Sequence, residues 1–130
     1  MAKFTCFEFD PVIYPFKFWV AKNGTKADIK DLFVDDEREE LLITDKEISG
    51  SRALTFDKVI HLKDGMIGAL TWLHTPKGCG DEEIAHESDH LANALYDHIG
   101  ASVDPRNDEP HAYLVGFAAK AIGSVLRDKS

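Results

Sequence analysis

The sequence lacks several features that define large classes of proteins. Its two cysteines, Cys6 and Cys79, are too few and too far apart for a disulfide framework. No stretch approaches the roughly 18 consecutive apolar residues that a membrane-spanning helix needs. Glu8 and Asp10 lie where an export signal would require an apolar run. We therefore expect a protein of a reducing cytoplasm with no membrane partner.

Positive charge is also scarce. The chain has 15 Lys and Arg residues against 23 Asp and Glu residues, which gives a formal net charge of −8. A protein that follows phosphate backbones needs a basic surface, so we expect no nucleic-acid partner. An acidic protein can instead mimic nucleic acid and bind a basic partner. The acids are spread along the chain, however, which favours a simple solubilising role.

What remains is the composition of an ordinary globular protein. Hydrophobic residues make up 44% of the 130 residues and charged residues 29%. A chain of this length can bury a core without disulfide or metal support. We expect one domain that spans residues 1–130.

The first half of the chain carries strand patterns. Residues 3–9 and 12–21 are rich in aromatic and β-branched residues and predict strands, interrupted by Pro11 and Pro15 in a way typical of a sheet edge. Thr25 has the pattern of a helix N-cap and predicts a short helix after it. Residues 53–62 and 66–73 predict a hairpin, in which Leu54, Phe56, Ile60 and Leu62 share one face and Lys58 is an exception.

Two longer helices are predicted in the second half. The first has the acidic residues 81–83 in its first turn and runs to about Ile99, where Gly100 provides a C-terminal cap. The second begins at Asp108, which we expect to cap it, with Pro110 tolerated in its first turn. The predicted fold class is α+β, a small twisted, mostly antiparallel sheet packed against two C-terminal helices.

The clearest chemical motif is His86-Glu87-Ser88-Asp89-His90, an HExxH sequence on the first of these helices. Four helical residues turn through roughly 400°, so both imidazoles project from one face and can bind one Zn²⁺. Glu87 lies beside them and can take a proton from water as a general base. The alternative is that these residues are polar groups on the surface of an amphipathic helix. The neighbouring residues are largely apolar, however, so we expect the motif to be buried and to need a metal as partner.

A catalytic zinc site needs a third protein ligand. Glu109 lies 18 residues after His90, at the start of the next helix, where an antiparallel pairing would bring it near the metal. His111 is a competing ligand. We favour Glu109, because residues i and i+2 of a helix point in very different directions.

Other polar residues near the motif have two interpretations each. Tyr113, one turn after Glu109, either donates a hydrogen bond to an oxyanion or belongs to the core. Asn93 and Asp97 either orient a histidine or take part in solvent and helix contacts. We expect Cys79 to be a free thiol rather than a ligand. The histidines at 61, 74 and 98 are isolated in the sequence, and we expect them to be structural or exposed.

Several segments resemble a family of small, mostly phage-encoded zincin-like metallopeptidases. They occur in the same order over nearly the whole chain, at residues 13–20, 68–73, 84–93, 99–100 with 104–105, and 109–116. The resemblance implies a minimal gluzincin-like site, in which His86, His90 and Glu109 are the ligands and Glu87 is the base. Asp89 departs from the family pattern, which has an apolar residue there, and His111 departs where Phe or Leu is expected.

Two classes of function follow. The first is a zinc-dependent peptidase, acting on a peptide or protein in the host cytoplasm if the gene is carried by a phage. The second is a non-catalytic, zinc-stabilised module that binds a host protein. An acidic mimic of nucleic acid is a weaker third hypothesis. The sequence predicts neither the substrate nor the oligomeric state.

Overall fold

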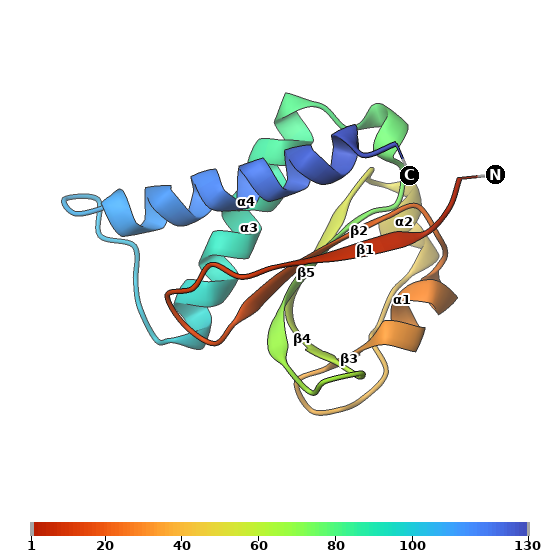
Figure 1. The fold of residues 1–130 in the computed structure, drawn as a ribbon, viewed down its shortest axis with the longest axis horizontal. Coiled ribbons are helices and arrows are strands. Elements are labelled where there is room, and N and C mark those ends of the chain that lie inside the picture. Colours follow the sequence, from red (N-terminus) through yellow and green to blue (C-terminus); the bar gives the residue numbers. More distant parts are fainter. Residues whose placement is uncertain (1, 130) are drawn as a thin grey trace.

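Five strands form one mixed sheet in the order β1-β2-β5-β4-β3 (Figure 1) in the computed structural model, which describes residues 2–129. The strands β2 and β5 are parallel, and the other three neighbouring pairs are antiparallel. The α+β class and the mostly antiparallel sheet are therefore confirmed, whereas the parallel central pair was not predicted. The strands are β1 (Thr5–Phe9), β2 (Lys17–Lys22), β3 (Phe33–Asp35), β4 (Leu54–His61) and β5 (Ile67–Leu73).

The three predicted helices are present, and a further short helix, α2 (Asp45–Ser49), was not predicted. The predicted helices are α1 (Lys26–Leu32), α3 (Asp81–His98) and α4 (Glu109–Arg127), with a short 3₁₀ turn, η1 (Pro76–Gly78), before α3. The Thr25 side chain caps α1, and Gly100 has the left-handed φ of 72° expected after α3. Asp108 precedes α4, but its ψ of 3° is not the extended conformation of a capping residue, and its side chain caps nothing. Asp108 is thus the N-cap residue of α4, as predicted, but without a capping hydrogen bond from its side chain.

Each face of the sheet has its own core. The helices α3 and α4 pack on one face, where Phe18 and Val20 of β2 meet leucines of both helices (Figure 1). Trp19 and Ala21 point to the opposite face, since successive strand residues alternate. Ile29 of α1 and the segment 41–43 cover that second face. Among residues 2–129, no helix combines the length and apolar character needed to cross a lipid bilayer.

The hairpin β4–β5 is confirmed, but the predicted face of β4 is wrong in its second half. The pairing with β5 shifts between Phe56 and Val59, which marks a β-bulge. After the bulge, the residue that packs in the same core as Leu54 and Phe56 is Val59, and not Lys58 or Ile60. The inserted residue reverses the in–out alternation. Lys58 now faces α3 and forms an ion pair with Asp97 at 3.8 Å.

Gly68 allows the parallel pair β2–β5 to approach closely. A Cβ atom at this position would collide with the backbone carbonyl oxygen of Lys17 and would lie 2.6 Å from Cζ3 of Trp19. We expect Gly68→Ala to lower the free energy of unfolding by about 2–4 kcal/mol, because neither the strand backbone nor the buried indole can move freely. Urea unfolding measures the loss. Gly116→Ala is the matched control, because a Cβ atom there meets nothing within 4 Å.

Candidate metal centre

The helix α3 brings the two motif histidines together, as their spacing predicts. The Nε2 atoms of His86 and His90 lie 3.1 Å apart, and both side chains are exposed. Two nitrogens bound to one tetrahedral Zn²⁺ at about 2.0–2.1 Å lie about 3.3 Å apart. The observed separation is close to this value. The donor set therefore fits two ligands of one metal ion.

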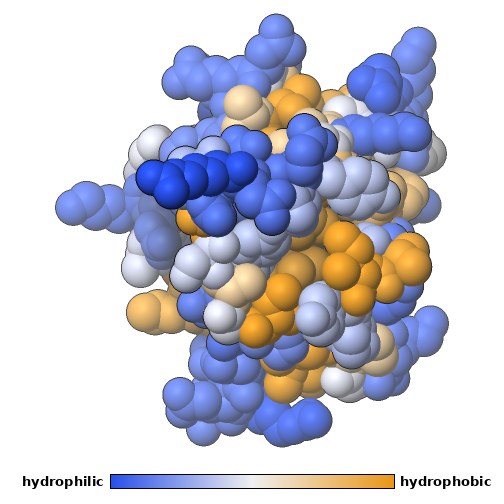
Figure 2. Space-filling model, turned by 90° about the vertical axis from the view of Figure 1, so that its left-hand side faces the viewer, coloured by the Kyte–Doolittle hydropathy of each residue, from blue (hydrophilic) through white to orange (hydrophobic). Residues whose placement is uncertain are grey.

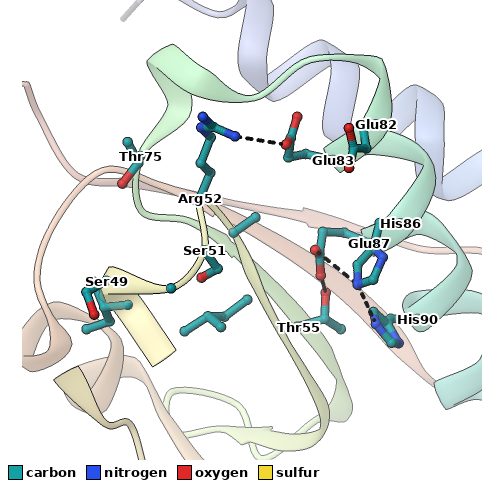
Figure 3. A pocket seen from close by; sticks show the side chains of 14 residues that line it. Ser49, Ser51, Arg52, Thr55, Thr75, Glu82, Glu83, His86, Glu87 and His90 are labelled. Carbon is teal, nitrogen blue, oxygen red and sulfur yellow. Dashed lines mark hydrogen bonds and ion pairs between the residues drawn. The ribbon is translucent and has the colours of Figure 1, made fainter. Parts of the chain in front are cut away.

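Glu87 is the third member of the cluster. The candidate ligand atoms of His86, Glu87 and His90 all lie within 4.8 Å of one another. The Glu87 Oε2 atom lies 4.0 Å from His86 Nε2. Its other oxygen, Oε1, accepts a hydrogen bond of 2.8 Å from Thr55 Oγ1 on β4. One carboxylate oxygen thus faces the histidines while the other is tied to the sheet (Figure 3).

Burial separates the three residues. Glu87 is only 6% exposed, but both histidines are open to solvent. The expectation that burial of the histidines would require a metal partner is therefore wrong. The helix buries a different side, formed by Ser88, Leu91, Ala92, Ala94 and Leu95, so the histidines stay on the rim. Exposure leaves both imidazole rings accessible from solvent.

A groove of about 910 Å³ lies beside the cluster (Figure 3). One wall is α3, and the other is residues 48–55, which include the start of β4. The strand β3 pairs only with residues 59–61 of β4, so within residues 2–129 no strand pairs with the outer edge of residues 54–58. At the far end of the groove, Arg52 pairs with Glu83 at 3.4 Å. The hydrogen bond from the backbone N–H of Gly80 is the main cause that lowers the pKa of Glu83.

The two candidates for the third ligand lie in the first turn of α4. The His111 Nε2 atom forms a 2.7 Å hydrogen bond with Asn93 Oδ1, one turn beyond His90 on α3. Since that oxygen can only accept, this nitrogen carries the hydrogen and is not free to bind a metal. Glu109 is exposed and is not part of the 4.8 Å cluster. Its role as third ligand stays a prediction.

The polar residues that follow the motif on α3 have partners other than His86 and His90. Asn93 joins Asp89 at 3.1 Å as well as His111, and so it pairs the two helices. Asp97 pairs with Lys58 of the sheet. Tyr113 is 59% exposed and does not line the groove, so it is not the core residue that one interpretation proposed.

Cys79 and the other histidines lie away from the histidine pair and contact other parts of the fold. Cys79 is a free thiol, as predicted, and burial is the main cause that raises its pKa. His74 bonds to Ser51 and Thr75, and burial lowers its pKa. His61 lies against Trp19 and Phe33, and His98 stacks on Phe16 with ring centroids 4.8 Å apart.

Sequence reasoning missed the residues that hold Glu87. Thr55 on β4 and Thr71 on β5 face each other in the hairpin, with their hydroxyl oxygens 2.7 Å apart. A signal was present, because Thr71 is the only side chain with a hydroxyl in the apolar segment 67–73. A buried hydroxyl needs a hydrogen-bond partner.

Comparisons of the chain with protein-family models, with curated proteins and with solved structures found no match. They lend no support to the resemblance to small zincin-like metallopeptidases, which stays a prediction. The interpretation of the site depends on the residues described above.

Proposed function

We propose that the chain is a zinc-dependent hydrolase of peptide bonds. The observation that carries the proposal is the cluster on α3, where two exposed imidazole nitrogens lie 3.1 Å apart beside a buried carboxylate, on the wall of a groove. Two histidines that share one ion and an adjacent carboxylate are the parts that metal-assisted hydrolysis requires.

Each residue has a separate role in this proposal. His86 and His90 hold the ion, and Glu109 is the proposed third ligand from α4. The ion would polarise the scissile carbonyl and lower the pKa of water. Glu87 accepts the proton of the attacking water at Oε2, the oxygen on the histidine side, and returns it to the leaving amine. The hydrogen bond from Thr55 holds the Glu87 carboxylate away from the ion, so that Glu87 is not a ligand in this proposal.

The proposed substrate is an extended peptide, either a flexible tail or a segment of a partner protein. Among residues 2–129, no strand pairs with the outer edge of residues 54–58, and this edge offers backbone groups to which such a peptide can add as a further strand. Leu54 and Thr55 line the groove at this edge, and His86 and His90 line it on α3. A peptide on the edge would pass in front of the histidines.

A peptide library tests the proposal directly. We expect the zinc-loaded protein to cleave library peptides, to lose the activity on treatment with 1,10-phenanthroline, and to regain it when Zn²⁺ is added back. Mass spectrometry identifies the products. Cleavage that continues undiminished in the chelated protein, after its zinc content has been shown to be negligible, would contradict a zinc-dependent reaction.

A binding module is the second candidate, and an exposed apolar loop favours it. Figure 2 shows a face, the left-hand side of Figure 1, on which hydrophobic residues gather between polar borders. The connection between β1 and β2 lies on that side and carries Val12, Ile13 and Tyr14, which are 82%, 50% and 46% exposed. Exposed apolar patches often mark protein contacts. This candidate predicts zinc retention without any cleavage of the library.

A further inference from the structure

The carboxylate of Glu87 is the end of a short hydrogen-bonded chain that begins inside the sheet. Thr71 on the central strand β5 is fully buried, and its hydroxyl lies 2.7 Å from that of Thr55 on β4. The Thr55 hydroxyl in turn lies 2.8 Å from Glu87 Oε1 on α3. Three elements are thus joined by side chains at the point where α3 crosses the hairpin.

Chemistry fixes the direction of this chain. A carboxylate has no hydrogen to donate, so the single O–H of Thr55 must point to Glu87. The oxygen of Thr55 then accepts a hydrogen bond from the Thr71 hydroxyl. A charge-assisted hydrogen bond of this kind is stronger than one between neutral groups.

The position of Thr55 in the strand also matters. Thr55 and Phe56 are the last residues of β4 in regular register with β5 before the bulge that precedes Val59. Bulges near functional sites re-aim side chains. Regular pairing with Thr71 therefore fixes Thr55 on the α3 face, while the strand beyond it changes course.

We propose that Thr55 and Thr71 are positioning residues that fix the orientation of the Glu87 carboxylate, with one oxygen held by Thr55 and the other facing the histidines. By holding Oε1, they leave Oε2 on the side of His86 and prevent the carboxylate from turning into the ligand set. The catalytic part of this inference rests on the proposed hydrolase function. The orientation of Glu87 is a property of the folded chain and can be tested without any reaction.

The test compares Thr55→Val, which removes the hydroxyl at nearly constant volume, with Thr55→Ser, which keeps it. The zinc-loaded proteins carry ¹³C at the glutamate carboxyl, and the resonance that is lost in Glu87→Gln identifies Glu87. We expect this resonance to move in Thr55→Val and in Thr71→Val, and to return close to its wild-type position in Thr55→Ser. Thr5→Val is the matched control, because Thr5 lies on the distant edge strand β1 and its buried hydroxyl has no partner within residues 2–129.

Kinetics supply the second measurement. For a peptide that the wild type cleaves, we expect Thr55→Val to lower kcat about 10- to 100-fold with little change in KM, because a misplaced base costs rate rather than binding. Thr55→Ser should restore most of the rate. Zinc affinity should change little in either variant.

The outcomes separate this inference from the proposed function. If the wild type binds zinc but cleaves nothing, the hydrolase fails, and the carboxyl resonance alone decides on the positioning. A Glu87 resonance that is unmoved in a folded Thr55→Val protein would overturn the inference. So would an active wild type whose kcat is unchanged by Thr55→Val.

Discussion

Replacing either His86 or His90 by Ala should lower the affinity for Zn²⁺ at least about 100-fold. Loss of groups that merely orient a ligand typically costs 10- to 100-fold, and loss of a ligand itself costs more. The two Nε2 atoms lie 3.1 Å apart, so each variant leaves a single imidazole in place of a pair. Competition with a fluorescent zinc chelator measures the affinity. Because both side chains are exposed, the variants should remain folded.

His98→Gln is the matched control for these variants. It removes an imidazole from the same helix, but His98 stacks on Phe16 and lies two turns beyond His90. Its zinc affinity should match that of the wild type. Equal affinities for His90→Ala and His98→Gln would show that any bound zinc is held elsewhere.

The second large effect is the loss of hydrolysis in Glu87→Gln. We expect kcat to fall about 10²- to 10⁴-fold, the usual contribution of a general base, while zinc stays bound. The amide oxygen can still accept from Thr55, which places the NH₂ group on the histidine side, where it cannot accept a proton. Hydrolysis of a library peptide, assayed together with zinc content, measures both parts of this prediction.

Glu37→Gln is the control for Glu87→Gln. It makes the same chemical change at an exposed position in the turn that follows β3, and Glu37 does not line the groove. Its rate should equal that of the wild type. A Glu87→Gln protein that keeps zinc and cleaves at the wild-type rate would exclude Glu87 as the base.

Local patterns predicted most of the elements of the fold. The N-cap at Thr25, the hairpin between residues 53 and 73, the extent of α3 and the start of α4 all follow from spacing, capping and turn residues that act within a few positions. Two features depend on contacts between distant segments and were not predicted. They are the parallel pairing of β2 with β5 and the bulge after Phe56. Lys58, the exception in an otherwise alternating pattern, was the local sign of that bulge.

The candidate site divides in the same way. The meeting of His86 and His90 follows from helical spacing alone. The contact of Glu87 with Thr55 does not, because it needs the register of β4 against β5 and the placement of α3 on the sheet. The same applies to His111 and Asn93, whose hydrogen bond depends on how α4 crosses α3. The apolar residues next to the motif led to the wrong prediction that the histidines are buried. Those apolar residues point to a different side of α3 from His86 and His90.

Crystals of the zinc-soaked protein, measured at the zinc absorption edge, test the central claim most directly. The account predicts one anomalous peak about 2.0–2.1 Å from the Nε2 atoms of both His86 and His90, with a carboxylate oxygen of Glu109 as third ligand and Glu87 outside the coordination sphere. No peak beside the two histidines at full zinc loading, or a peak at another site, would contradict it.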